Sequence, residues 1–184
     1  LKQQQTNQEL KIATDIQTKL LPEKLPELPN YSFGAISVSA REVGGDYYDA
    51  FLLANGEVGL LICDIVGKGV PAALVMVMIK SIFITYAHML PSPKDLFERV
   101  NKVLCNDLTV DKYVPIFYAV INPATKRLRY SNAGHEPAYL LRASTETYEK
   151  LDTEGFPVGA MEDTVYEEKE LAMDDDDIFL MFTD

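Results

Sequence analysis

The sequence predicts an α+β fold in which antiparallel β-sheets pack together and are covered by α-helices. The order of the elements supports this class: two long helical patterns, at 71–90 and 93–107, lie mid-chain between groups of short strand-like segments. Regular alternation of strands and helices, which produces a parallel sheet, is not seen. The 184 residues, 47% of them hydrophobic, suffice for one domain with a substantial core.

The chain begins with an amphipathic helical pattern and a proline-rich stretch. Between residues 9 and 21 apolar residues recur every three or four positions, until Pro22 ends the pattern; they are Leu10, Ala13, Ile16 and Leu20. Residues 22–30 contain three prolines among charged residues, which is typical of an extended linker. We therefore expect a linker over residues 1–29 and a domain over 30–184. The apolar stripe would pack either on this domain or in a coiled coil.

Segments rich in β-branched and aromatic residues predict the strands before the helices. The first is 31–40, and a hairpin over 49–53 and 58–62 turns at Asn55-Gly56, the strongest hairpin signal in the sequence.

The two helices follow a loop with two glycines, at 64–70. Pro71 suits the first turn of a helix that ends near Leu90, and its continuous apolar character predicts burial on most sides. A second helix is expected after Ser92-Pro93, to about Asp107. Its inner face would carry Leu96, Val100, Val103 and Leu104.

The second half of the chain is again strand-rich. Turn-forming residues at 122–125 and four aspartates at 174–177 separate apolar or alternating segments. The strands expected here are 112–121, 127–131, 138–142, 164–171 and 178–182.

Composition excludes several classes of function. The formal charge of −11 would repel a nucleic-acid backbone, so we expect no nucleic-acid partner. Cys63 and Cys105 lie far apart in apolar runs and predict buried thiols in a reducing compartment. The most apolar stretch, 70–84, is too short to span a membrane, and the polar start is unlike a signal peptide. We expect a cytoplasmic location without membrane contact.

Three aspartates share a setting that suits metal binding. Asp46 follows two glycines, Asp64 precedes the Gly67-Lys68-Gly69 segment, and Asp184 ends an apolar strand. A rigid strand end beside a glycine loop can hold a carboxylate near open space. Mg²⁺ and Mn²⁺ prefer a few oxygen ligands, with water filling the other positions. Each aspartate alone could be a turn former or strand cap, but the repeated arrangement favours a shared site.

Five short motifs give the sequence a specific resemblance. They are VGGDYYD at 43–49, CDIVGKGVPAAL at 63–74, SNAGHEP at 131–137, GFPVG at 155–159 and FTD at 182–184. In this order they resemble the RsbU/SpoIIE-type bacterial serine phosphatases of the PPM superfamily, which includes protein phosphatase 2C. The resemblance covers roughly residues 30–184 and implies a four-layer αββα fold. It also implies that 1–29 would link the phosphatase domain to an upstream sensor domain.

The resemblance implies a pair of Mn²⁺ or Mg²⁺ ions at one end of two stacked sheets. Asp64 would bridge the ions, the Ile65 carbonyl would join one of them, Asp46 would bind that ion directly or through water, and Asp184 would hold the second. Gly45 and the Gly67-Lys68-Gly69 loop would face the substrate. Two cations about 4 Å apart activate a shared water for in-line attack on phosphorus.

Two departures from the family pattern matter. Val66 stands where eukaryotic relatives place a histidine that can protonate the leaving oxygen, and where bacterial relatives often have a small polar residue. The family pattern also continues past Asp184 with another metal-binding aspartate, so we expect the C-terminal part of the domain to be missing and the second metal site to be incomplete.

The expected function is hydrolysis of phosphoserine or phosphothreonine on a regulatory protein of the anti-sigma-factor antagonist type. Val66 and the missing aspartate leave open a pseudophosphatase that binds a phosphoprotein without turnover. A third hypothesis makes the helix at 9–21 a homodimerising switch, which is compatible with either of the others.

Four other features have simpler interpretations. We expect His135 to tie a turn between strands, His88 to be a packed or surface histidine, and Asp49 to support the Asp46 loop without binding metal. The acidic run 174–177 would be a solvated turn.

Overall fold

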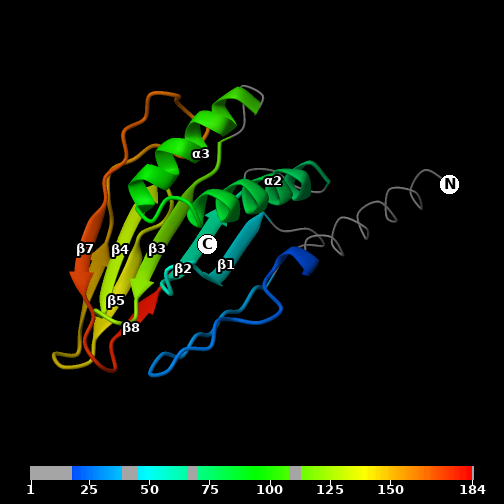
Figure 1. Cartoon of the computed structure of the whole chain (residues 1–184). Helices are drawn as coiled ribbons and strands as arrows, with labels where there is room; N and C mark the ends of the chain where they lie inside the picture. The colour runs from blue at the N-terminus through cyan, green and yellow to red at the C-terminus, as the bar shows by residue number, and fades with distance from the viewer. Residues whose placement is uncertain (1–17, 39–44, 66–69, 108–112, 184) are drawn as a thin grey trace.

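The structure is a computed structural model that describes residues 18–38, 45–65, 70–107 and 113–183. Most of the helix expected at 9–21 lies outside these residues, and 18–20 are helical. The described chain forms two antiparallel sheets with helices over one of them (Figure 1).

The larger sheet has five strands in the order β1-β2-β3-β4-β7, with every neighbouring pair antiparallel. Its strands are β1 (Asp46–Leu52), β2 (Val58–Asp64), β3 (Ile116–Asn122), β4 (Arg127–Ala133) and β7 (Lys169–Ala172). The smaller sheet has the order β6-β5-β8. Its strands are β5 (Ala138–Arg142), β6 (Thr147–Leu151) and β8 (Ile178–Leu180).

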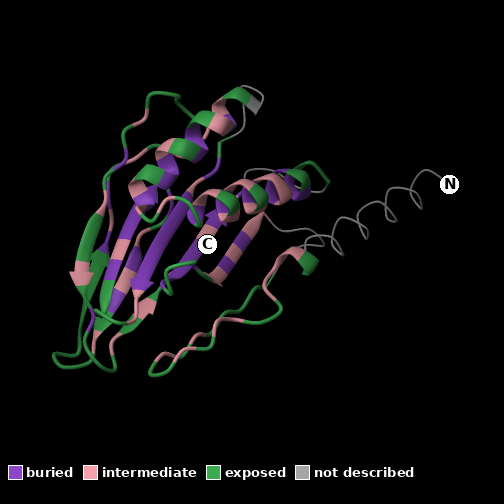
Figure 2. Ribbon diagram, viewed as in Figure 1, coloured by how far each residue is buried: buried purple, intermediate pink, exposed green. Residues whose placement is uncertain are grey.

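Two apolar layers hold these elements together. Along β3 the side chains alternate: Ile116, Tyr118 and Val120 belong to a core shared with the helices, while Phe117, Ala119 and Ile121 belong to a core shared with the smaller sheet. Because both faces are covered, β2 and β3 are buried along nearly their whole length (Figure 2). The predicted α+β class with two stacked antiparallel sheets and helices is confirmed, and the described helices cover the larger sheet.

The two helices are α2 (Val70–Ala87) and α3 (Pro93–Asp107). By length and composition α2 would also suit a membrane span, but in this structure it packs on the larger sheet. Its buried residues are Ala72, Ala73, Val75, Met76, Ile79, Phe83 and Ala87. The expected burial on most sides is therefore wrong: one face packs on the sheet, and Leu74 on another face is 64% exposed. On α3 the inner face carries Leu96, Phe97, Val100 and Leu104, whereas Val103, expected there, is only half-buried.

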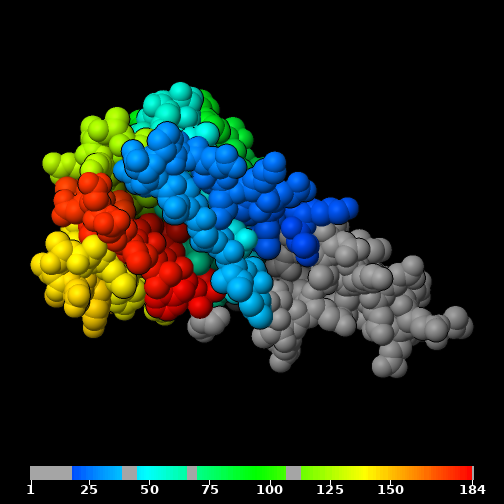
Figure 3. Space-filling model, turned by 90° about the horizontal axis from the view of Figure 1, so that it is seen from below, coloured from blue at the N-terminus to red at the C-terminus, as the bar shows by residue number. Residues whose placement is uncertain are grey.

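The strand expected at 31–40 is wrong for its described part, 31–38. Tyr31 makes one isolated bridge with Leu28, and no ladder follows. Ile36 and Val38 are 85% and 82% exposed, because the segment pairs with no neighbouring strand among the described residues. It lies beside the last residues of the chain, where light blue meets red in Figure 3.

The sequence also gave no expectation of β6. Four of its five residues are exposed, so it has no apolar alternation, and it is ordered by its ladder to β5. Two predicted strands are longer than the observed ones. β7 and β8 are shorter than the strands expected at 164–171 and 178–182. The acidic turn at 174–177 differs from expectation at one residue: Asp177 has a buried carboxylate.

Asp177 ties the smaller sheet together. It accepts hydrogen bonds from Arg142 (2.8 Å) and from the backbone amides of Ala143 and Asp174 (both 3.0 Å). Removal from water raises the pKa of the Asp177 carboxyl, but the two amides and Arg142 outweigh this and lower the pKa below its usual value.

We expect Phe83→Ala to lower the free energy of unfolding by about 3–5 kcal/mol, because it empties a fully buried site. The Phe83 ring lies 4.9 Å from the Tyr118 ring and 5.9 Å from the Phe97 ring, so α2, α3 and β3 all lose contacts. Urea unfolding measures the change. Leu74→Ala on the exposed face of α2 is the control, expected to cost no more than about 0.5 kcal/mol. Equal losses would contradict the packing described.

We expect Asp177→Asn to destabilise the protein at pH 7 and to reduce the dependence of stability on pH. A carboxyl whose pKa is lower in the folded state stabilises that state fully at pH values above its unfolded-state pKa of about 3.9. This contribution is lost as the pH falls through the folded-state pKa. The difference between wild type and variant in urea unfolding should therefore shrink below about pH 4. A difference that stays constant with pH would contradict the assignment.

Candidate active site

Two of the predicted site aspartates lie opposite each other on neighbouring strands. Asp46 is the first residue of β1, Asp64 is the last residue of β2, and the antiparallel register pairs them directly. Directly opposed residues point to the same side of a sheet, with Cβ atoms roughly 5 Å apart. Asp46 was expected in a loop, so its place inside the ladder is a correction that fixes its position more firmly.

The two carboxylates lie on the side of the sheet that faces the smaller sheet. Side chains an even number of positions from Asp46 or Asp64 on the same strand point to the same side of the sheet. Three of them belong to the layer between the sheets: Ala50, Leu60 and Ile62. The intervening residues Tyr47 and Cys63 belong to the layer under the helices. Asp46 and Asp64 therefore lie at one end of the space between the two sheets.

The backbone adds a third oxygen to this end. The Ile65 amide donates a 2.9 Å hydrogen bond to the Gly45 carbonyl. A Cβ atom on Gly45 would collide with the Ile65 carbonyl oxygen and would lie 3.2 Å from Asp64 Oδ1. Because Gly45 has no side chain, the Ile65 carbonyl and the Asp64 carboxylate can approach the same point.

This set of oxygens fits a hard divalent cation. Carboxylates and backbone carbonyls are the ligands that Mg²⁺ and Mn²⁺ accept, with water completing the shell. Within the described ranges, no group of three or more His, Cys, Asp or Glu side chains could hold a metal. The protein ligands available there are thus the two carboxylates and the carbonyl.

The remaining predicted site residues lie outside the described part of the chain. These are Asp184 and the loop residues Gly67, Lys68 and Gly69, together with Val66. Thr183, which precedes Asp184, lines the same cavity as Asp46.

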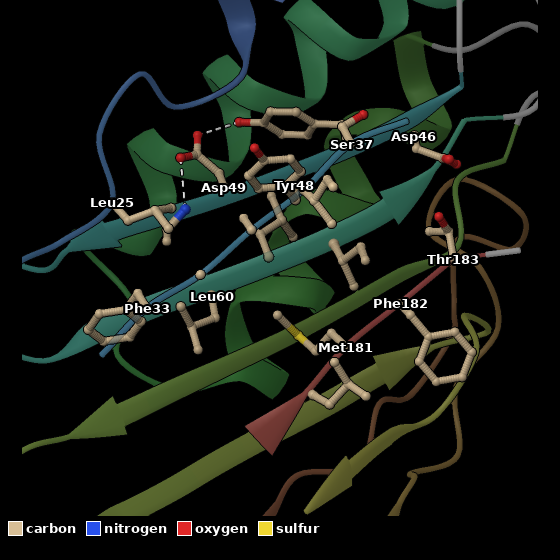
Figure 4. Close-up of a pocket in the computed structure, with 18 of the residues that line it drawn as sticks. Leu25, Phe33, Ser37, Asp46, Tyr48, Asp49, Leu60, Met181, Phe182 and Thr183 are labelled. Atoms are coloured by element: carbon tan, nitrogen blue, oxygen red, sulfur yellow. Dashed lines mark hydrogen bonds between the residues drawn. The ribbon is translucent and has the colours of Figure 1, made fainter. Parts of the chain in front are cut away.

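A cavity of about 760 Å³ lies between the two sheets and is lined at one end by Asp46, whereas Asp64 is not among its lining residues. Three segments line it: 32–38, the β1–β2 pair, and 179–183. Asp46, Phe182 and Thr183 lie at one end, and Leu25, Phe33 and Leu60 lie at the other (Figure 4). One carboxylate lies toward each end, Asp46 near Thr183 and Asp49 near Leu25, and most of the other lining side chains are apolar. The sequence gave no signal for this apolar lining.

Asp49 has a structural role on the opposite side of β1. Its buried carboxylate accepts hydrogen bonds from Tyr47 Oη (2.5 Å), Lys80 Nζ (2.9 Å) and the Ala50 amide (2.9 Å). Burial and the neighbouring Asp49 raise the pKa of Tyr47 far above its usual value, so its hydroxyl stays a donor. The geometry agrees with Asp49 as a support and not a ligand.

Lys80 connects this cluster to the start of the described chain. Besides its ion pair with Asp49, its ammonium donates a 2.7 Å hydrogen bond to the Leu20 carbonyl. Leu20 and Leu21 also pack against the core under the helices. Residues 18–21 are therefore attached to the domain through the same lysine that neutralises Asp49. Asp49 follows Asp46 by three positions on β1. Sequence reasoning did not single out Lys80 for this role.

His135 ties a turn, as expected. Its amide donates to Asn132 Oδ1 (2.8 Å), its carbonyl accepts from Asn132 Nδ2 (2.9 Å), and Gly134 between them has a φ of 68°. The imidazole Nδ1 lies 2.9 Å from the Glu136 carbonyl. His88 is an exposed residue whose ring contacts Phe51.

Both cysteines are free thiols, as predicted, although Cys105 is only half-buried. Burial raises the pKa of the Cys63 thiol well above its usual range, with the nearby Asp64 and Asp46 adding to the effect. Cys63 is therefore an unreactive core residue beneath the aspartate pair.

Comparisons with known proteins agree with this fold. Residues 54–184 match the family model described as stage II sporulation protein E (SpoIIE). The chain is 31% identical over 182 residues to the phosphoserine phosphatase RsbU of Bacillus subtilis. The aligned region covers 99% of this chain and 54% of RsbU. It thus spans about half the length of that relative.

Two solved structures share the fold. The SiaA-PP2C domain of Pseudomonas aeruginosa has a TM-score of 0.71 at 17% identity, covering 94% of this chain and 69% of that one. The PP2C phosphatase domain of SpoIIE from Bacillus subtilis, solved with a fragment of its regulatory domain, has a TM-score of 0.65 at 18% identity. The match covers 74% of this chain and 40% of that one.

We expect Lys80→Ala to destabilise the protein by about 2–3 kcal/mol, because it leaves the buried Asp49 carboxylate without its cation. Lys94→Ala, which removes a lysine from an exposed ion pair with Glu98, should cost at most about 0.5 kcal/mol. Urea unfolding compares the two variants. A double variant, Lys80→Met with Asp49→Asn, should recover part of the loss; no recovery would contradict the ion pair as its cause.

Proposed function

Because the chain belongs to the SpoIIE family, we propose that it is the catalytic part of a metal-dependent serine/threonine phosphatase. The observation that carries the proposal is the pairing of Asp46 with Asp64 beside the Ile65 carbonyl, with Asp46 lining one end of a cavity between the two sheets. Among its relatives, RsbU is named a phosphoserine phosphatase.

In this proposal the chain's own oxygens hold Mn²⁺ or Mg²⁺. Asp64, the Ile65 carbonyl and Asp46 would hold one ion, and Asp64 and Asp184 would hold a second. When bound, the ions would supply an activated water and would neutralise charge on the phosphoryl oxygens. Gly45 leaves room for this arrangement, since any side chain there would fill the space beside the Ile65 carbonyl.

The protein residues then supply rigidity and orientation. The ladder between β1 and β2 fixes the separation of the two carboxylates, and the Pro115 carbonyl accepts a 3.2 Å hydrogen bond from the Asp64 amide. Carboxylates held before the substrate arrives need no reorganisation during the reaction. Gly45, Gly67, Lys68 and Gly69 are proposed to line the approach of the phosphorylated side chain. Val66 offers no proton to the leaving oxygen, which leaves that role to water.

The proposed substrate is a phosphorylated regulatory protein of the anti-sigma-factor antagonist type, in the cytoplasm. Support comes from the relative RsbU, which is named a phosphoserine phosphatase, and the formal net charge of −11 disfavours a nucleic-acid partner. An upstream sensor domain joined through residues 1–29 would control the activity. The helix expected at residues 9–21 of this linker would also dimerise the protein.

A binding module without turnover is the second candidate function. The observation that favours it is Val66, which leaves the site without a proton donor at that position. A full-length protein that binds no Mn²⁺ at millimolar concentration in calorimetry would favour this candidate over the enzyme.

We expect Asp64→Asn in the full-length protein to lower p-nitrophenyl phosphate hydrolysis with Mn²⁺ by at least about a thousandfold, because the ligand assigned to both ions loses its charge. Calorimetry should show Mn²⁺ affinity falling in parallel, and circular dichroism should show an intact fold. Asp95→Asn, an exposed carboxylate in the first turn of α3, is the control and should retain full activity. Turnover that survives Asp64→Asn would sink the assigned role.

A further inference from the structure

The loop at 153–165 presents an unusual group of exposed apolar side chains. Phe156, Met161 and Val165 are 58%, 55% and 75% exposed. They surround a hollow of about 500 Å³ that they line together with Thr153, Glu154 and Asp163. Apolar side chains gathered on one exposed loop are typical of an interaction surface. We call these three side chains and their hollow the apolar platform.

The platform is held in place by buried polar contacts. Asn101 on α3 is fully buried, and its amide donates to the carbonyls of Met161 (2.8 Å) and Glu162 (3.1 Å) while accepting from the Gly159 amide (2.8 Å). In Figure 1 the orange segment accordingly runs beside α3. A surface that is already ordered loses little conformational entropy when a partner binds.

The same loop is joined to the end of the sheet where Asp64, the last residue of β2, lies. Val158 and Val114 form a two-way backbone bridge of 2.8 and 3.0 Å. Pro115, next to Val114, accepts the hydrogen bond from the Asp64 amide. On the other side, a Cβ on Gly134 would collide with Pro157, so the loop also packs against the end of β4. The platform loop is therefore connected to the end of β2 that carries Asp64 through Val158, Val114 and Pro115.

Acidic residues predominate around the platform. Residues 152–168 contain no lysine or arginine, and their acidic residues are Asp152, Glu154, Glu162, Asp163, Glu167 and Glu168. Asp152 and Glu167 form ion pairs with Lys150 and Lys169, which flank this segment. Glu154, Glu162 and Asp163 belong to the platform segment itself. An apolar centre with acidic neighbours attracts basic partners and repels anionic lipid and nucleic-acid surfaces.

We propose that the apolar platform docks the protein substrate, and that it selects a segment with one or two large apolar side chains flanked by lysine or arginine. This inference rests on the proposed phosphatase function, since the platform loop is connected by backbone hydrogen bonds to the strand end that carries Asp64. Docking energy comes from the apolar side chains in the hollow, and the neighbouring carboxylates favour basic flanks over acidic ones.

The test uses the full-length protein and two fluorescein-labelled phosphoserine peptides. Both peptides carry the same leucine and phenylalanine, and they differ only in having lysines or glutamates on the flanks. Fluorescence anisotropy measures binding, and phosphate release measures turnover. We expect the lysine peptide to bind at least about tenfold more tightly than the glutamate peptide.

Three variants separate the apolar and charged contributions. Met161→Ser with Val165→Ser should weaken binding of the lysine peptide about tenfold. Glu162→Lys with Asp163→Lys should abolish or invert the preference between the peptides. Tyr148→Ser, which removes an equally exposed aromatic ring from the smaller sheet, should change neither. All three should hydrolyse p-nitrophenyl phosphate like the wild type, because that substrate is too small to reach the platform.

The outcomes distinguish the two proposals. Equal binding of the two peptides, or unchanged binding by the serine double variant, overturns the docking inference whatever the hydrolysis rates. A wild-type protein that prefers the lysine peptide through this platform but releases no phosphate from any substrate supports docking and overturns the enzyme.

Discussion

The pairing of β1 with β2 is the constraint from which the proposed site follows. β2 is covered on one side by helices and on the other by the smaller sheet, so its register cannot slip by one residue without moving Leu61 and Cys63 out of one core and Leu60 out of the other. This double burial holds Asp64 at the end of the strand and Asp46 opposite it. The position of the two carboxylates is thus a consequence of core packing.

The surroundings of this pair combine rigid support with access. Behind the sheet, Asp49, Tyr47 and Lys80 form a buried polar cluster that also holds the Leu20 carbonyl. In front, the cavity opens between the sheets, bordered by segments 32–38 and 179–183 that pair with few neighbours. To one side lies the apolar platform, anchored through Asn101. A scaffold of this kind can keep the chemistry constant while the bordering loops determine which protein is bound.

The sequence predicted the parts of the molecule whose signals are local. The Asn55-Gly56 turn, helix α2 and a strand overlapping the one expected at 112–121 each appear near the expected place, because turn chemistry and burial act on neighbouring residues. The strand expected at 31–40 does not form over its described residues, 31–38, because strand formation needs a partner ladder as well as β-branched residues. Strand β6 was missed because only Leu151 of its side chains is buried. Asp46 and Asp64 were identified from motifs, yet their direct opposition depends on a register that sequence does not encode locally. Lys80 and Asn101 were missed for the same reason, since their partners lie 31 and roughly 60 residues away.

The central claim is that Asp46, Asp64 and the Ile65 carbonyl share a divalent cation, and crystals of the full-length protein grown with Mn²⁺ would test it most directly. Anomalous diffraction locates manganese independently of any assumed ligand. The account requires a peak about 2.0–2.3 Å from oxygens of Asp64 and Ile65 and within direct or water-mediated reach of Asp46. Manganese found only elsewhere, or the two aspartates turned away from a common centre in crystals soaked to saturation, would contradict it.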